Sequence, residues 1–453
     1  MKAIIYGAGQ IGYNIAAYLS AEENDIVVID ESAELVNKVN ETLDVQAVQG
    51  FGSYPDLLEK VGANKADLMI AVTPCDEYNI IACQVAYSIF KIPTKIAHIR
   101  GAHYLDPAWQ HIYNPDNIPV DYIISPEKEV ARNLVTNLDV PGSIEVVNLE
   151  TDLCTVVGLY CRESCPIINT PLKQVGELFP NLNFRVLCIV REGVPLIPGP
   201  DDQMYKGDEV YIAVEQEKLS RLTTLFGLHV EPLEKAIIVG AGNVGMALAS
   251  ELLAKMPDLD LKIIEKDEQK AQIAAQMIEN AVVIHGDALD SHRLKEANVT
   301  TADMVLSVMN NDESNVLCAL LSKNLGAKYV MSLVNNATYP KFLLSLGVDS
   351  VLNPGSVTMS HILRHVRRSD IRSLHVMQGN FGEIFECDVV ADSKLIGEKF
   401  RSLNVPEKSI VGGIVRSDEF IIPSSQDFIE ENDHIILLVK REFISDVEKL
   451  FRK

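Results

Sequence analysis

The stretch KAIIYGAGQIGYNIAAYLS, residues 2–20, decides the fold of the first part of the chain. A short apolar run leads into Gly7, Gly9 and Gly12, and apolar residues three and four positions apart follow, as in an amphipathic helix. This G-x-G-x-x-G spacing between a strand and a helix is typical of a dinucleotide-binding turn. The first glycine permits the tight turn, the second lets the backbone approach a pyrophosphate, and the third allows close packing of the helix on the sheet.

An acidic residue at the end of the next predicted strand supports this interpretation. The apolar run 26–29 ends at Asp30, which lies 23 residues after Gly7. A carboxylate at this place accepts hydrogen bonds from the adenosine ribose and disfavours a 2′-phosphate, which favours NAD(H) over NADP(H). ADP and ATP carry the same ribose and stay open as alternative ligands. Further strands are predicted at 45–49, 66–73, 95–100 and 121–124, and their alternation with helices predicts a doubly wound parallel sheet.

The same order of features returns in the second half of the chain. The run 235–239 leads into Gly240, Gly242 and Gly245, and the next strand ends at Glu265. Residues 48–79 match residues 284–315 at a constant offset of 236. A self-match of this length indicates a duplication, so we expect two Rossmann-like α/β domains.

A second repeated segment follows each of these domains. VREGVPLIP (190–198) matches VRSDEFIIP (415–423), and KGDEVYIAV (206–214) matches ENDHIILLV (431–439), both at an offset of 225. Both copies are rich in strand patterns and predict a small α+β domain with an antiparallel sheet. The expected boundaries are 1–140 and 232–370 for the dinucleotide-binding domains and 143–228 and 373–453 for the small domains.

The two predicted nucleotide sites differ in the groups available for phosphates. In the first, His98 and Arg100 lie toward the end of a strand, where arginine can bind phosphate through two hydrogen bonds. The matching positions of the second unit are assigned to Ser332 and Val334, so its phosphate contacts should be weaker. The loops after the fourth strands, Thr73-Pro74 and Met309-Asn310, are expected beside the adenosine ribose.

Composition and charge limit the classes of partner. The net charge of −23 opposes binding to nucleic acid or to bare anionic lipid. No apolar run reaches the roughly 18 residues of a membrane span, and the N-terminus lacks the pattern of a signal peptide. The eight cysteines are scattered without metal-site spacing, which indicates free thiols, no metal and a cytoplasmic location.

No catalytic constellation accompanies the two turns. A dehydrogenase needs an acid or base placed over the nicotinamide, and none is evident, so no catalytic residue is assigned and the chain is not expected to be an enzyme. Two nucleotide units in one chain instead suit a two-state device that a ligand shifts. An NAD-dependent oxidoreductase and a nucleotide sensor for some other partner remain the alternatives.

The order of motifs resembles the tandem RCK (also called KTN) regulatory subunits of Trk potassium-uptake systems. GAGQIG…VID and GAGNVG…IIE resemble the N-terminal RCK domain, and the strings around 190–214 and 415–439 resemble the C-terminal RCK domain. The resemblance covers essentially the whole chain. The variant Gly50-Phe51-Gly52-Ser53 belongs to it as well.

The resemblance implies a peripheral subunit on the inner face of the cell membrane. It would bind a membrane potassium transporter of the TrkH/TrkG type and form a homo-oligomer, expected as a tetramer with a ring of eight RCK units. NAD(H), ATP or ADP would gate the transporter without turnover. The implied ligands are Gly7, Ala8, Gly9, Gln10, Ile11, Gly12, Asp30, Thr73, Pro74, His98 and Arg100 in the first site, and Gly240, Ala241, Gly242, Asn243, Val244, Gly245, Glu265, Met309 and Asn310 in the second. His98 stands where family members often have arginine, which implies a pH-dependent affinity near neutrality.

Overall fold

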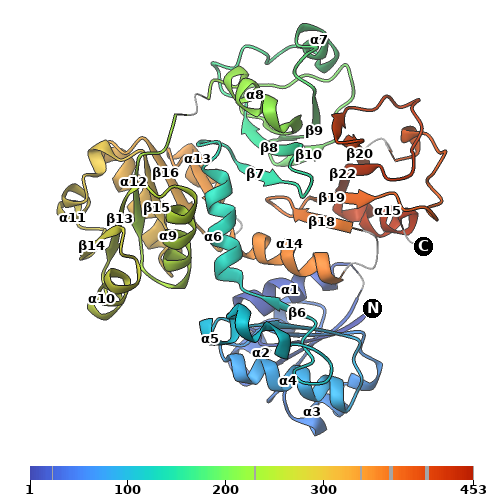
Figure 1. Cartoon of the computed structure of the whole chain (residues 1–453), viewed down its shortest axis with the longest axis vertical. Helices are drawn as coiled ribbons and strands as arrows, with labels where there is room; N and C mark the ends of the chain where they lie inside the picture. Colours follow the sequence, from blue (N-terminus) through green and yellow to red (C-terminus); the bar gives the residue numbers. More distant parts are fainter. Residues whose placement is uncertain (23, 229–230, 337–338, 367–370, 404–407, 452–453) are drawn as a thin grey trace. The chain divides into compact units, whose positions relative to one another are not determined.

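The computed structural model describes residues 1–22, 24–228, 231–336, 339–366, 371–403 and 408–451 (Figure 1). Its first sheet is parallel, with the strand order β3-β2-β1-β4-β5-β6. The strands are β1 (Lys2–Tyr6), β2 (Asp25–Asp30), β3 (Gln46–Gln49), β4 (Leu68–Ala71), β5 (Thr94–His98) and β6 (Tyr122–Ile124). The helices between them include α1 (Gln10–Ser20), α2 (Ala33–Thr42), α3 (Pro55–Lys60), α4 (Asp76–Ser88) and α5 (Ala102–Leu105).

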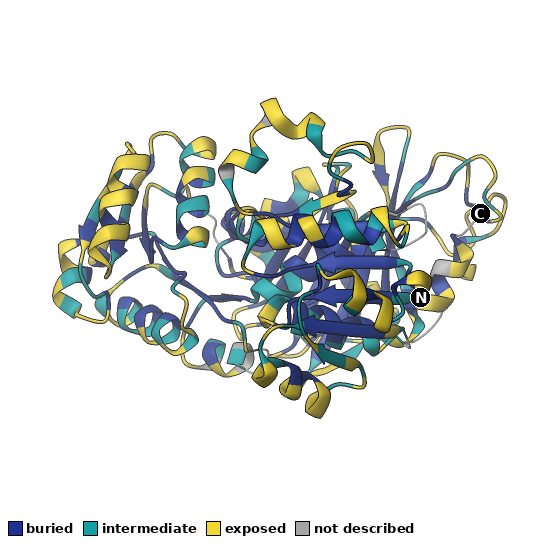
Figure 2. Ribbon diagram, turned by 90° about the horizontal axis from the view of Figure 1, so that it is seen from below, coloured by how far each residue is buried: buried dark blue, intermediate teal, exposed yellow. Residues whose placement is uncertain are grey.

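The second parallel sheet repeats this topology in the order β14-β13-β12-β15-β16-β17. Its strands are β12 (Lys235–Val239), β13 (Asp260–Glu265), β14 (Ala281–His285), β15 (Met304–Ser307), β16 (Tyr329–Leu333) and β17 (Ser350–Leu352). Helices α9 (Asn243–Lys255) and α10 (Glu268–Met277) cover one face, and α11 (Ser291–Glu296), α12 (Asp312–Leu325) and α13 (Tyr339–Ser345) cover the other. Figure 2 shows buried strands and helices with one buried and one exposed side, as expected for this layering.

Each Rossmann-like region is followed by a five-stranded antiparallel sheet. The first has the order β10-β9-β11-β8-β7 and the second β18-β19-β22-β20-β21. The first contains β7 (Glu145–Asn148), β8 (Cys154–Tyr160), β9 (Phe184–Arg191), β10 (Val194–Leu196) and β11 (Glu209–Glu215), with helices α7 (Leu172–Leu178) and α8 (Leu219–Leu225). The second contains β18 (Ile371–Val376), β19 (Gly382–Asp388), β20 (Ser409–Arg416), β21 (Glu419–Ile421), β22 (His434–Lys440) and helix α15 (Ile444–Leu450). The predicted fold class is therefore confirmed.

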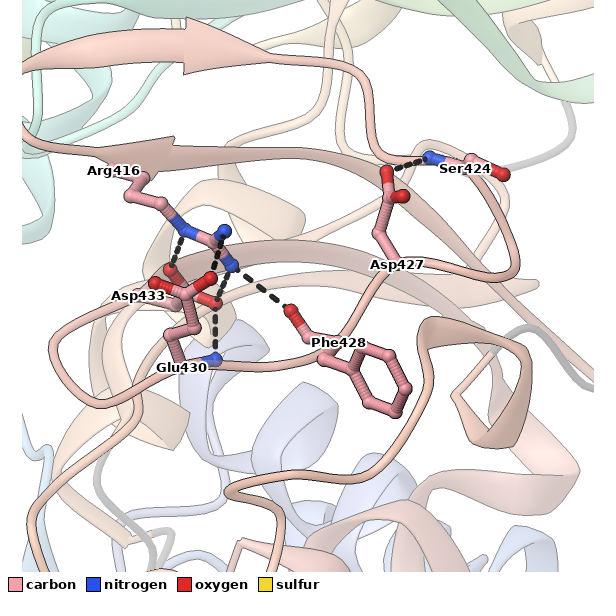
Figure 3. A network of polar contacts seen from close by, with 6 residues as sticks. All are labelled: Arg416, Ser424, Asp427, Phe428, Glu430 and Asp433. Atoms are coloured by element: carbon pink, nitrogen blue, oxygen red, sulfur yellow. Dashed lines mark hydrogen bonds and ion pairs between the residues drawn. The ribbon is translucent and has the colours of Figure 1, made fainter.

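The duplication of the small domains extends to individual hydrogen bonds. Arg416 binds both carboxylate oxygens of Asp433, at 2.7 and 2.8 Å, and the carbonyl of Phe428 at 3.0 Å (Figure 3). In the first copy, Arg191 binds both oxygens of Asp208, at 3.0 and 2.8 Å, and a carbonyl at 2.8 Å. The Asp433 and Asp208 side chains are almost fully buried. This repeated arginine–aspartate pair joins the end of one long strand to the turn before another.

The helices after the last strands are exchanged between the two Rossmann-like regions. α6 (Pro126–Asn137) follows β6 of the first sheet, but Val130 and Leu134 pack in the same core cluster as Leu248 and Leu252 of α9. α14 (Pro354–Val366) follows β17 of the second sheet, yet most of it belongs to the compact unit formed by Met1–Pro126. There the ring of His365 stacks on Tyr122 with centroids 3.9 Å apart.

Candidate nucleotide-binding sites

The first glycine turn has the backbone that a bound pyrophosphate requires. Gly7 has a φ of +110°, which only glycine adopts readily, and its counterpart Gly240 has +104°. A Cβ on Gly12 would come within 1.8 Å of the Gly7 carbonyl oxygen, so this glycine is needed where helix α1 crosses β1. Gly9, in contrast, is exposed, and a Cβ added to it would have no other atom within 4 Å. The second glycine therefore leaves room for a ligand against the backbone.

The helices that start at the turns carry no group that competes with an anion. α1 begins after Gly9 and α9 after Gly242, and neither has a side-chain cap or an acidic residue in its first turn. α2 and α10 begin with caps from Ser32 and Asp267 instead. The first N–H groups of α1 and α9 thus remain available for phosphate oxygens, which the helix dipole also favours.

The two carboxylates at the ends of β2 and β13 are held in the same way. The Ala8 N–H donates to Asp30 Oδ2 at 2.6 Å, and the Ser32 N–H donates to Oδ1 at 2.8 Å. In the second unit, Glu265 accepts from the Ala241 N–H at 2.6 Å and from the Asp267 N–H at 2.8 Å. A carboxylate offers about four acceptor positions, so each retains capacity for two ribose hydroxyls. These contacts also orient each carboxylate toward its glycine turn.

A buried asparagine that the sequence analysis missed holds the loop after the fourth strand. Asn79 Oδ1 accepts from the Thr73 N–H at 2.9 Å and the Thr73 hydroxyl at 2.8 Å, and its Nδ2 donates to the carbonyls of Thr73 and His98. Asn315 makes the matching backbone contacts with Met309 and Leu333. Each amide therefore ties the loop after the fourth strand to the end of the next strand. The signal was present as D-x-x-N in both copies, Asp76–Asn79 and Asp312–Asn315.

The aspartate of each D-x-x-N motif accepts hydrogen bonds from the backbone just after the next strand, β5 or β16. Asp76 accepts from the backbone N–H groups of Arg100 and Gly101, and Asp312 accepts from those of Asn335 and Asn336. Arg100 therefore corresponds to Asn335, and His98 corresponds to Leu333. The assignment of Ser332 and Val334 to these positions was wrong by one residue. From the aspartate of the motif to the end of the next strand, Asp312–Leu333 is one residue shorter than Asp76–His98, whereas the assignment made it two residues shorter. The second site still lacks a basic residue at either position.

The structure gives His98 and Arg100 different surroundings. His98 is fully buried at the end of β5, whereas Arg100 is exposed just beyond it. Arg100 Nε donates to His98 Nε2 at 3.3 Å. Arg100 is thus the exposed member of this pair, beyond the carboxyl end of β5, and His98 is the buried member that it contacts.

The remaining sequence-predicted residues lie at the same ends of the two parallel sheets. Thr73 is buried and Pro74 exposed after β4, and Met309 and the exposed Asn310 follow β15. Gln10 and Asn243 are the exposed first residues of α1 and α9, with the partly buried Ile11 and Val244 next to them. The carboxyl ends of parallel strands are where ligands bind in open α/β sheets.

Two other kinds of site are absent from the described part of the chain. No helix there is long and apolar enough to cross a membrane. No group of three or more histidine, cysteine, aspartate or glutamate side chains among the described residues is arranged to hold a metal ion.

Comparison with solved structures supports the fold. A structure of the GsuK channel superposes with a TM-score of 0.63 at 16% identity and covers 100% of this chain and 79% of that one. The GsuK channel bound to NAD gives a TM-score of 0.62, also at 16% identity, over 99% of this chain and 78% of that one. At this identity the likeness shows a shared fold alone.

Comparison with sequence families shows the relationship directly. The TrkA-N domain matches residues 3–126 and 236–354, and the TrkA-C domain matches residues 160–227 and 384–452. A Trk system potassium uptake protein TrkA from Azorhizobium caulinodans is 36% identical over 452 residues, covering 100% of this chain and 99% of that protein. A TrkA from Vibrio alginolyticus is 33% identical over 456 residues, with 100% and 99% coverage. The chain therefore belongs to the TrkA family of Trk system potassium uptake proteins, with tandem pairs of TrkA-N and TrkA-C domains.

Proposed function

We propose that this chain is a nucleotide-responsive regulatory subunit of a membrane potassium transporter. It binds NAD(H), with ATP and ADP as competing ligands, and it does not turn them over. It acts from the cytoplasmic face of the membrane as a homo-oligomer attached to a TrkH/TrkG-like transporter subunit. Its membership in the TrkA family supports the transport role.

The observation that carries the nucleotide proposal is the pair of open glycine turns, each with a carboxylate fixed at its ribose end. Gly9 leaves space for a pyrophosphate, and Asp30 keeps acceptor positions for a ribose. The binding residues we propose are those predicted from the sequence, with Asn79 and Asn315 positioning the loops that carry Thr73 and Met309. Solved structures of the GsuK channel include one bound to NAD and one bound to ADP, which supports the same ligand class here.

In this proposal the first site binds nucleotides more tightly than the second. Arg100 lies just beyond the carboxyl end of β5 in the first unit, and its counterpart Asn335 carries no charge. A guanidinium binds phosphate through charge-assisted hydrogen bonds, which an amide cannot match. We therefore assign nucleotide discrimination to the first site.

The test is an equilibrium titration of the full chain with NADH and ATP, comparing wild type, Asp30→Ala and Glu265→Ala. Asp30→Ala should weaken NADH binding by more than Glu265→Ala does. The same variants are then tested for potassium uptake in cells that depend on the Trk transporter. A wild-type chain that stays monomeric and binds neither NADH nor ATP would contradict the proposal, and steady NADH oxidation with small carbonyl compounds would favour an oxidoreductase.

A further inference from the structure

Three aromatic side chains of the first unit gather at the end of its parallel sheet. Phe51 and Tyr54, on the loop after β3, stack with ring centroids 5.0 Å apart and planes 28° from parallel. Tyr78, in the first turn of α4, meets Phe51 edge to face at 6.3 Å. Tyr54 and Tyr78 are 53% and 44% exposed. We call Phe51, Tyr54 and Tyr78 the aromatic wall.

Backbone contacts place the aromatic wall beside the ribose carboxylate. The Gly50 N–H donates to the Asp30 carbonyl at 2.8 Å, so Phe51 directly follows a residue bonded to Asp30. Gly52 packs on the ring of Tyr6, and a Cβ there would come within 2.4 Å of that ring. Tyr6 is the last residue of β1 and immediately precedes Gly7. The aromatic wall therefore lies next to both the glycine turn and Asp30.

The environment of Tyr6 is consistent with the position of Tyr78 at this end of the sheet. The Tyr6 hydroxyl donates to Glu31 Oε1 at 3.2 Å. Burial and the negative charge of Glu31 raise the pKa of Tyr6 above its usual value, and the nearby Tyr78 adds to the rise. The Tyr6 hydroxyl therefore lies beside Glu31, the residue that follows Asp30, and Tyr78 lies on the same side of Tyr6 as Phe51, which it contacts.

The second unit has polar side chains in place of the aromatic wall. The hydrogen bonds of the two loops align Phe51, Tyr54 and Tyr78 with Asp287, Asp290 and Ser314. Asp287 forms an ion pair with Lys266 at 2.9 Å, and Asp290 caps α11 by accepting from the His292 N–H at 2.9 Å. Both aspartates serve the local structure of the loop. At the matching positions the first unit has the aromatic residues Phe51 and Tyr54 instead of these two aspartates.

We propose that the aromatic wall stacks on the adenine base of a nucleotide whose ribose is bound by Asp30. The inference rests on the proposed function, because it takes the nucleotide position from the glycine turn and Asp30. An aromatic face stacks on a flat base without reading its hydrogen-bonding edge. The wall therefore gives the first unit a base-binding element that the second unit lacks, in addition to the cation Arg100.

The experiment compares ADP with ribose 5-diphosphate, which has the same sugar and phosphates but no base. Both are titrated into the full-length wild type, Phe51→Ala and Tyr78→Ala, and photolabelling with 2-azido-ADP followed by peptide mapping assigns binding to the first or second unit. Each variant should weaken ADP binding in the first unit by about 5- to 100-fold, as expected for one lost ring–base contact. The affinity for ribose 5-diphosphate should stay within about twofold.

Asp287→Ala is the matched control, because it removes the side chain at the position of Phe51 in the second unit. It should leave the affinity of the first unit for ADP unchanged. Tyr78 is exposed on a helix, so Tyr78→Ala should fold normally even if the loss of Phe51 disturbs its loop. Equal losses of affinity for ADP and ribose 5-diphosphate, or no loss for either, would overturn the proposed stacking on the base but would not contradict nucleotide binding. A wild type that binds neither compound would instead overturn the proposed function.

Discussion

At the scale of single residues, Arg100 is the clearest difference between the two proposed nucleotide sites. Its side chain is exposed beyond β5, and Asp76 holds its backbone N–H, a group that an alanine variant keeps. Arg100→Ala should weaken ATP binding by about tenfold while changing adenosine binding little, because only ATP presents phosphates to the guanidinium. Lys60→Ala, an exposed lysine on α3, is the control and should leave both affinities unchanged. Equal losses for ATP and adenosine would mean that Arg100 does not contact phosphate.

A second residue, Cys75, reports directly on occupation of the first site. It follows Pro74 in the loop after β4 and is partly exposed, whereas the other seven cysteines are buried. Burial raises the pKa of Cys83 and of Cys188 to about 12, so these thiols are protonated at neutral pH and react slowly. Iodoacetamide should therefore modify Cys75 first in the native chain, and NADH should slow this reaction severalfold. Early labelling of the buried cysteines would contradict the packing described, and labelling that NADH does not affect would argue against a ligand at this loop.

At the scale of elements, two glycines of the first turn have different roles: Gly9 leaves space for a ligand, and Gly12 allows close packing. Gly9 has an extended backbone that any residue adopts, and it borders open space. Gly9→Ala should change the free energy of unfolding by less than about 1 kcal/mol but weaken NADH binding at least tenfold, since the methyl group occupies the path of the pyrophosphate. Gly12→Ala should destabilise the first unit strongly, because its Cβ would lie 1.8 Å from the Gly7 carbonyl oxygen. Thermal unfolding and an NADH titration of both variants check this contrast, which fails if Gly9→Ala binds NADH normally.

Elements with a complete pattern within one stretch of chain could be predicted from the sequence. The strands at 2–6 and 235–239, the turns after them and the repeated small domains were predicted correctly. The exchange of α6 and α14 could not be predicted, because an apolar helix face such as that of Val130 and Leu134 indicates burial but not which sheet it packs against. Asn79 was missed because the D-x-x-N signal has no periodicity, and because the role of Asn79 on helix α4 depends on the carbonyl of His98 on strand β5, far along the chain.

At the scale of the whole molecule, the duplication lets the two small domains pack on each other. Val156, Leu187 and Tyr211 of the first share one hydrophobic cluster with Ile384 and Ile436 of the second. The guanidinium of Arg185 donates to two carbonyls of the second domain, at Val411 and Pro423, each at 3.0 Å. The pairing thus buries apolar surface and also satisfies buried polar groups, so one chain contains an interface that two unduplicated chains would have to form between them.

A further polar contact of this interface is the pair of Glu145 and His375. Glu145 Oε2 lies 2.7 Å from His375 Nε2, and Oε1 accepts from the Gln378 N–H at 3.2 Å. The two side chains are only 6% and 13% exposed. Glu145→Ala should destabilise the paired domains by about 3 kcal/mol, because it leaves the histidine ring and an N–H group buried without their acceptor. Glu163→Ala removes a carboxylate from an exposed pair with Lys206 and should cost less than about 1 kcal/mol. Hydrogen exchange of the β7 and β18 amides measures both changes in the full chain, and similar exchange rates in the two variants would show that the Glu145–His375 contact does not hold the domains together.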